Sequence, residues 1–260
     1  MSVAEGPTEL APVSPPGRSR EPQVWKFWGT SVWGLILFVA MFVGQVAGVV
    51  YFLVVNGAAF DLNSIMAITA NGRVISLSVI MGLPAILLAL WAATRWSGVP
   101  FADYLALRWP SWRMFGAGVG GLVLLLLAWE VISRLAGHES SPGFMIDVLK
   151  TAQNDGALWL LVIAFCVAAP LSEELLARGF LYRGWSESFL RPFGAILLSS
   201  AVWTAMHMQY NWFFLAQVFS IGLLFGYLRY RTNSLWLTVI LHGINNLAAT
   251  VQTFWLAHHS

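Results

Sequence analysis

Long runs of apolar residues separated by short polar segments make up most of this chain. A helical run of about 20 apolar residues can cross the hydrocarbon core of a bilayer. Such runs lie at 31–55, 74–94, 114–135, 157–179, 193–208, 212–228 and 235–256. An eighth helix fits at either 181–190 or 142–151. The pattern predicts an all-α fold, a polytopic transmembrane helix bundle of about seven or eight helices.

The first 24 residues break this pattern, because they are rich in Pro, Ser, Gly and Glu. Such a composition buries too little apolar surface to order itself. The segment also lacks the apolar core of a signal peptide. We expect residues 1–24 to form a disordered cytoplasmic tail, and residues 25–260 to form the transmembrane helical domain.

Composition supports a membrane protein and excludes several other classes. The 260 residues are 58% hydrophobic and 10% charged, whereas soluble domains carry about 25% charged residues. A net charge of +2 gives no reason to expect a nucleic-acid partner. The single cysteine, Cys166, excludes an internal disulfide. It is either a small buried apolar residue or a thiol nucleophile.

Basic residues are distributed unevenly between the two sides of the predicted bundle. The amino-terminal tail and the even-numbered loops hold 10 of them, and the odd-numbered loops hold 3. Loops rich in Lys and Arg stay in the cytoplasm. The amino terminus is therefore predicted to be cytoplasmic and the carboxyl terminus to lie outside, unless an eighth helix is present.

Three pairs of glycines four residues apart lie in the apolar runs. This spacing lets helices approach closely, either within the bundle or between two copies of the chain. The pairs are Gly44 and Gly48, Gly116 and Gly120, and Gly222 and Gly226. The oligomeric state is not determined by this pattern.

The main polar interruption is the stretch 169–179, where two acids and an arginine follow an uncharged run. Ionisable residues within a membrane are costly and mark functional sites by default. Glu174 and Arg178 are four residues apart, with the acid first, which favours an ion pair on a helix. Glu173 projects about 100° away from Glu174. We expect Arg178 to neutralise Glu174 and Glu173 to face a different partner.

Two later runs contribute histidines and an amide. His207 follows Trp203 by four residues, and His242 precedes Asn246 by four residues on one helix face. Together with Glu173, the two histidines form a set that catalytic zinc uses. Without a metal, Glu173 would act as a general base on water, helped by His207, while His242 and Asn246 stabilise an oxyanion. Zn²⁺ held by Glu173, His207 and His242 therefore remains an alternative to a metal-free site.

These motifs resemble a known family. Glu173-Glu174-x-x-x-Arg178, Trp203-x-x-x-His207 and His242-x-x-x-Asn246 resemble, in order and rough spacing, the three motifs of the type II CAAX prenyl protease and bacteriocin-processing (CPBP or Abi) intramembrane proteases. Trp203 stands where the family usually has phenylalanine, and we expect it to remain an aromatic packing residue. Glu174, Arg178 and Trp203 are thus predicted to have structural, supporting roles.

The resemblance covers about residues 157–251, which we take as a protease-like core. It implies a site that opens toward the cytoplasm and the membrane, and catalytic roles for Glu173, His207, His242 and Asn246. The expected function is an intramembrane endopeptidase of the bacterial inner membrane, surrounded by the lipid bilayer, that cleaves a peptide or membrane-associated protein. A proton-coupled transporter and a non-catalytic peptide-binding immunity protein are the alternatives.

The distribution of basic residues generates a topological prediction. A reporter fused after Arg20, or within residues 97–113, should report a cytoplasmic location, because both sites lie on the Lys- and Arg-rich side. Activity of a periplasmic reporter at residues 97–113 would contradict the orientation.

Overall fold

The computed structural model describes residues 23–138 and 141–259, and all secondary structure in these segments is helical. Eight helices of seven or more residues occur there when the central helix is counted as one, so the all-α prediction is confirmed. Most of the predicted disordered tail, residues 1–24, lies outside the described residues.

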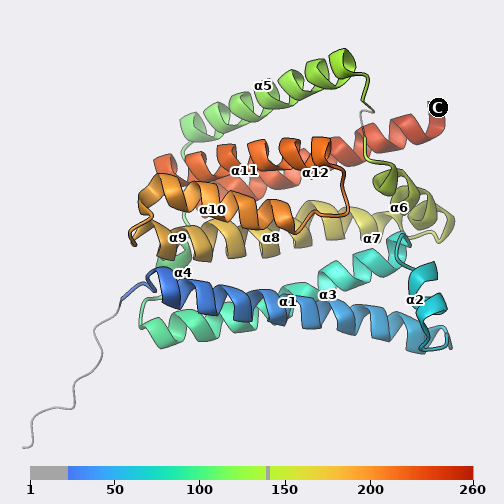
Figure 1. The fold of residues 1–260 in the computed structure, drawn as a ribbon, viewed down its shortest axis with the longest axis horizontal. Coiled ribbons are helices and arrows are strands. Elements are labelled where there is room, and N and C mark those ends of the chain that lie inside the picture. The colour runs from blue at the N-terminus through green and yellow to red at the C-terminus, as the bar shows by residue number, and fades with distance from the viewer. Residues whose placement is uncertain (1–22, 139–140, 260) are drawn as a thin grey trace, which may run out of the picture.

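The long helices run roughly parallel or antiparallel to one another (Figure 1). They are α1 (Phe27–Val55), α3 (Gly72–Ser97), α5 (Trp112–Ala136), the central helix (Leu158–Ser186), α10 (Arg191–Ala205), α11 (Trp212–Thr232) and α12 (Leu235–His259). Short helices connect some of them: α2 (Leu62–Ala67), α4 (Phe101–Leu105) and α6 (Gly143–Asn154).

Five helices in the described segments are long and apolar enough to cross a membrane: α1, α3, α5, the central helix and α11. The predicted run 193–208 becomes α10, whose 15 residues extend only about 22 Å. This is less than the roughly 30 Å of a hydrocarbon core. Helix α12 has 25 residues, but His242, Asn245 and Asn246 reduce its hydropathy. The long helices outside the set are therefore α10, which ends two residues before the predicted site residue His207, and α12, which carries His242 and Asn246.

The central helix is the most enclosed of the five. Half of its most apolar window is buried inside the protein, compared with 22% for α1 and 11% for α5. Buried side chains such as Leu175, Leu176 and Phe180 join it to the main hydrophobic core. The polar side chains of Ser172, Glu174 and Arg178 on this helix are buried with it.

Hydrogen bonds between chain segments define one end of the bundle. The Gln23 N–H donates to the Ser97 carbonyl at 3.1 Å, and the Leu235 N–H donates to the Ala106 carbonyl at 2.9 Å. These bonds join the starts of α1 and α12 to the end of α3 and to α4. We name this the basic end because it gathers eight of the described Lys and Arg residues: Lys26, Arg95, Arg108, Arg113, Arg183, Arg191, Arg229 and Arg231.

Different bonds define the opposite end. The Gly72 N–H donates to Thr151 Oγ1 at 2.8 Å, and Asn71 Nδ2 donates to Asp155 Oδ2 at 3.1 Å. These contacts join the start of α3 to α6. The described basic residues at this end are Arg73, Arg134 and Lys150. The fold thus keeps the charge asymmetry of the sequence, with the start of α1 at the basic end and the end of α12 at the opposite end (Figure 1).

The glycine pairs differ in what they contact. A Cβ atom on Gly48 would lie 2.7 Å from Ser78 Cα, so α1 packs directly on α3. Gly222 and Gly226 face Ser200 and Ile196 of α10 in the same way. Gly116 and Gly120, in contrast, have no heavy atom within 4 Å of such a Cβ in the described protein. Two of the three pairs therefore serve packing within the bundle.

This difference generates a prediction. Gly48→Leu should lower the stability of the purified protein, measured by thermal unfolding in detergent, because the side chain would meet the backbone of α3. Overpacking of this kind typically costs about 1 to 3 kcal/mol. Gly120→Leu is the matched control on an open face and should leave the unfolding transition in place. Equal effects of the two substitutions would contradict the packing assignment.

Candidate functional site

The central helix changes its winding on both sides of the two acids. Its segments are α7 (Leu158–Ile163), a π-helix (Ala164–Ala168), α8 (Ala169–Glu174), a second π-helix (Leu175–Leu181) and α9 (Tyr182–Ser186). Such π segments inside α-helices are rare and frequently occur at functional sites. Here one ends just before the α8 segment that carries Glu173 and Glu174, and the other begins just after it.

Glu174 and Arg178 form the buried ion pair that the sequence predicts. Arg178 Nη1 donates to Glu174 Oε1 at 2.9 Å, and neither side chain is exposed. Arg178 Nη2 donates to the Gly222 carbonyl at 3.1 Å. The guanidinium carbon also lies 4.5 Å from the ring centroid of Trp203. The pair therefore connects the central helix to α10 and α11 through one cation.

Glu173 faces the two histidines. Its Oε2 atom lies 4.0 Å from His207 Nε2 and 3.9 Å from His242 Nε2. The Glu173 side chain is 16% exposed, whereas that of His242 is 3% exposed. Three helices thus bring these groups around one point, as the motif spacing predicts. Their roles in catalysis stay predictions.

The other ring nitrogen of each histidine has an acceptor. His242 Nδ1 lies 3.2 Å from Glu174 Oε1, and His207 Nδ1 lies 3.0 Å from the Trp203 carbonyl. Carboxylate and carbonyl oxygens only accept, so we assign the hydrogen of each neutral ring to Nδ1. Both Nε2 atoms then present lone pairs to the Glu173 side. Glu174 is therefore directed toward Arg178 as expected, but it also orients His242.

Trp203 makes a contact that sequence reasoning missed. Its Nε1–H donates to Glu173 Oε2 at 2.6 Å, and the residue is almost fully buried. The ring also lies edge-on to His207 and His242, with centroids 5.1 and 5.3 Å away. The expectation of a packing residue is therefore incomplete. The departure from phenylalanine at this position was the available signal, because only the indole carries an N–H.

Asn246 is placed differently from the histidines. Its Nδ2 donates to the Phe165 carbonyl at 2.8 Å, and its Oδ1 accepts from Asn245 Nδ2 at 3.2 Å. One amide hydrogen of Asn246 is thus used to hold α12 on the central helix. The side chain still lines the same cavity as Glu173, His207 and His242.

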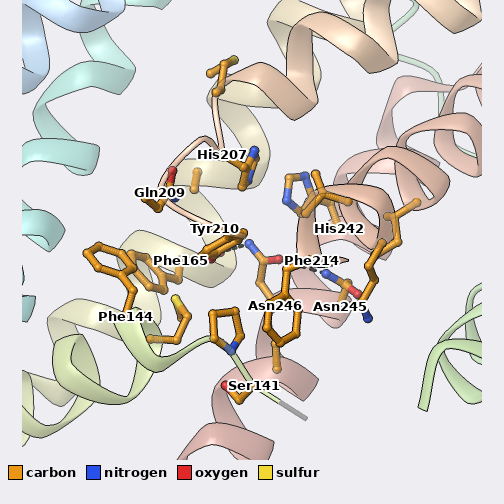
Figure 2. Close-up of a pocket in the computed structure, with 18 of the residues that line it drawn as sticks. Ser141, Phe144, Phe165, His207, Gln209, Tyr210, Phe214, His242, Asn245 and Asn246 are labelled. Carbon is orange, nitrogen blue, oxygen red and sulfur yellow. Dashed lines mark hydrogen bonds between the residues drawn. The ribbon is translucent and has the colours of Figure 1, made fainter. Parts of the chain in front are cut away.

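These side chains line a cavity of about 900 Å³. Figure 2 shows His207, His242, Tyr210 and Asn246 around it, with Phe144 and Phe165 together on one wall. Tyr210 is a further lining residue that the sequence did not single out. Burial, with the nearby Glu173 carboxylate as a smaller cause, raises the pKa of Tyr210 to about 12. Its phenol therefore stays neutral and can donate a hydrogen bond.

The cavity does not extend toward the basic end. Its lining reaches Glu130 and Arg134 near the end of α5, Ser141 and Phe144 beside α6, and Thr253 in α12. All five lie toward the opposite end of the bundle (Figure 1). The family resemblance implies a site open to the cytoplasm, whereas the predicted orientation places the basic end there. These two expectations cannot both hold, because the cavity extends away from the basic end.

The side chains of Glu173, His207 and His242 are suitable metal ligands by type, but the distances from Glu173 to the two histidine rings are too long for one zinc ion. Each histidine has a partner on Nδ1 that would orient it as a ligand. Ligands of one zinc at 2.0 to 2.2 Å lie about 3.3 to 3.6 Å apart, less than the 3.9 and 4.0 Å found here. In the described residues no group of three His, Cys, Asp or Glu side chains meets the geometry of a metal site. The cysteine, Cys166, is free and half-buried.

Comparisons with known proteins point to the same part of the chain. Residues 155–248 match the model of the type II CAAX prenyl endopeptidase Rce1-like family. An uncharacterized 24.3 kDa protein of Escherichia coli is 35% identical over 125 residues, which are 47% of this chain and 51% of that protein. The chain thus spans about half the length of this relative. No solved structure matches the chain.

The matched segment contains every residue that converges on the cavity from α8, α10 and the first half of α12. Residues 155–248 form a domain of the type II CAAX prenyl endopeptidase Rce1-like (CPBP) family.

Proposed function

We propose that this protein is an intramembrane endopeptidase that hydrolyses a peptide bond with a water molecule activated by Glu173. One observation carries the proposal: the Glu173 carboxylate and the Nε2 atoms of His207 and His242 converge within 4.0 Å inside a cavity of the helix bundle. Family membership of this domain gives the reaction class its support.

The distances from Glu173 to the two histidine rings suit a bridging water molecule. Polar groups farther apart than 3.5 Å commonly interact through one bridging water, and Glu173 lies at such a distance from both rings. Glu173 removes a proton from this water, and the resulting hydroxide attacks the carbonyl carbon of the substrate. Glu173 then returns the proton to the leaving amine. General acid–base catalysis of this kind contributes about 10²- to 10⁴-fold to a rate.

The tetrahedral intermediate carries an oxyanion that needs hydrogen-bond donors. Asn246 has a second Nδ2 hydrogen besides the one given to Phe165, and the neutral Tyr210 phenol lines the same cavity. Neutral His242 does not donate from Nε2, because its ring hydrogen lies on Nδ1 and is directed at Glu174. We assign the second Nδ2 hydrogen of Asn246 and the Tyr210 phenol as the two oxyanion donors.

Zinc remains the alternative for the same residues. Glu173, His207 and His242 would hold it, and bound zinc would acidify the water and polarise the substrate carbonyl. The three side chains would first have to move closer together. All steps above use the protein's own groups and proceed without this movement.

The direct experiment is cleavage of peptides by the purified protein. A library of apolar peptides is incubated with the protein in detergent, with and without a chelator, and products are identified by mass spectrometry. Cleavage that survives chelation supports the glutamate mechanism. Cleavage lost on chelation and restored by Zn²⁺ supports the metal alternative. No cleavage of any peptide would favour a transporter or a peptide-binding protein.

The two acids should respond differently to substitution. Glu173→Gln should reduce turnover at least about 100-fold without changing the unfolding temperature, because the amide keeps the shape but cannot accept the proton. Glu174→Gln is the matched control on the adjacent position. It should destabilise the fold, since it leaves the Arg178 charge buried without its partner. Full activity of Glu173→Gln with loss of activity in Glu174→Gln would reverse the two assignments.

Trp203 should act as a positioning residue. Trp203→Phe keeps an aromatic ring over Arg178 but removes the hydrogen bond to Glu173, and bonds to charged groups are worth about 1.5 to 3 kcal/mol. We expect kcat to fall about 10- to 100-fold with little change in KM. Phe225→Leu is the control, because that ring also lies near Arg178, at 5.8 Å, and packs against Trp203. A kcat loss in Phe225→Leu as large as in Trp203→Phe would indicate a role in packing alone.

A further inference from the structure

A buried arginine near the end of α11 lacks the partners that such a charge requires. The Arg229 side chain is 2% exposed, and its Nη1 donates to Asn233 Oδ1 at 2.7 Å. Its Nε and Nη2 atoms are also buried, and they have no acceptor in the part of the chain that the structure describes. None of the ion pairs in the described residues includes Arg229. Buried polar groups are nearly always hydrogen-bonded, so these two unpaired donors need an explanation.

A second buried arginine shows how a paired one is arranged. Arg178 donates to the Glu174 carboxylate and to the Gly222 carbonyl, which leaves its Nε atom without a partner. Arg229 has only the neutral amide of Asn233 in place of the carboxylate. A buried charge without a partner of opposite sign is strongly destabilising. The environment of Arg229 is therefore suited to an anion.

The neighbours of Arg229 are aromatic or positively charged. Its guanidinium carbon lies 5.5 Å from the ring centroid of Tyr182. Two further cations, Arg183 in α9 and Arg108 just after α4, lie close enough to repel it. The Nε atom of Arg183 is likewise buried without a hydrogen-bond partner. Three arginines from separate segments thus lie near one another, and two of them have unused buried donors.

The carboxylates at the basic end do not neutralise Arg229. Glu187 pairs with Arg183 at 2.8 Å and Asp103 with Arg108 at 3.9 Å, but these four side chains are between 34% and 64% exposed. Exposed ion pairs contribute little. In the described segments these are the two carboxylates at this end, against eight Lys and Arg side chains. The negative end of the α11 dipole amounts to only about half a charge.

The position of Arg229 matches the depth of lipid headgroups. Arg229 precedes the last residue of α11 by three positions, about 4.5 Å along the helix. Exposed tryptophans occur at the same end of the bundle: Trp28 near the start of α1, Trp96 near the end of α3 and Trp112 at the start of α5 (Figure 1). Tryptophan is enriched at the membrane–water interface, which is where phospholipids carry their phosphates.

We propose that Arg229, together with Arg183 and Arg108, binds a phosphate group at the basic end, carried by the headgroup of an anionic phospholipid. Phosphate oxygens accept several charge-assisted hydrogen bonds, and the guanidinium fork matches their geometry. Basic pockets between transmembrane helices bind anionic headgroups in this way. The Nε and Nη2 atoms of Arg229 are covered by protein atoms, so binding requires a surface side chain to move. Arg183 and Arg108 can do so, because both are partly exposed.

Thermal unfolding of the delipidated protein in a neutral detergent tests this site without any activity assay. Dioleoylphosphatidylglycerol, dioleoylglycerol and sodium phosphate are added separately, since the second has the same chains but no phosphate. A ligand that binds the folded protein raises its unfolding temperature with concentration. We expect phosphatidylglycerol to raise this temperature and dioleoylglycerol to leave it unchanged. An equal rise with sodium phosphate at the same phosphate concentration would keep the site but make its ligand a soluble phosphate compound.

Arg229→Met and Arg231→Met form a matched pair of variants. Both remove one positive charge from the end of α11, but Arg231 is exposed and projects about 200° around the helix from Arg229. We expect Arg229→Met to weaken the affinity for phosphatidylglycerol at least about 30-fold, because two charge-assisted bonds are lost. Arg231→Met should weaken it no more than about fivefold, the contribution of one surface cation. Without added lipid, Arg229→Met should unfold no earlier than the wild type, because an apolar side chain replaces a buried charge.

Several results would overturn the proposal. One is an Arg229→Met protein that unfolds earlier than the wild type yet binds phosphatidylglycerol equally well, because Arg229 would then be a structural residue. Another is the absence of any rise in unfolding temperature with either phosphate compound. If Arg229→Met does not fold, Arg183→Gln tests the same site, since that side chain is 34% exposed and tolerates replacement. Unchanged affinity of Arg183→Gln for phosphatidylglycerol would then contradict the assignment.

Discussion

The ion pair between Glu174 and Arg178 is the interaction on which the site depends. Both side chains are fully buried at the centre of the bundle, where a charge without a partner would be strongly destabilising. Arg178 also donates to the Gly222 carbonyl and lies against the Trp203 ring, and Glu174 accepts from His242. One pair of charges thereby fixes the central helix relative to α10, α11 and α12.

Around this pair, each candidate catalytic side chain is oriented by a neighbour. His242 is held through Nδ1 by Glu174, His207 through Nδ1 by a backbone carbonyl, and Glu173 by the indole N–H of Trp203. Supporting contacts of this kind set the direction of lone pairs and raise the precision of a site. As a result, three acceptor atoms, from the central helix, the turn after α10, and α12, face one small volume that suits a water molecule.

The same constraint explains where the cavity lies. His207 lies in the turn just after α10, and its position beside Glu173 requires this helix to stop near the middle of the bundle rather than cross it. The missing half of that helix leaves the gap that the cavity occupies. The early end of this short helix therefore places a candidate catalytic residue beside the cavity.

The sequence by itself determined the all-α class, the apolar runs that became long helices, and the pairing of Glu174 with Arg178, because these depend on contacts within one helix. The order of three motifs also placed Glu173, His207 and His242 together. Only the tertiary structure decided that Trp203 donates to Glu173, that Asn246 bonds to Phe165, and that the cavity extends away from the basic end. These features arise between helices far apart in the chain, and their geometry depends on helix lengths and packing that residue spacing does not encode.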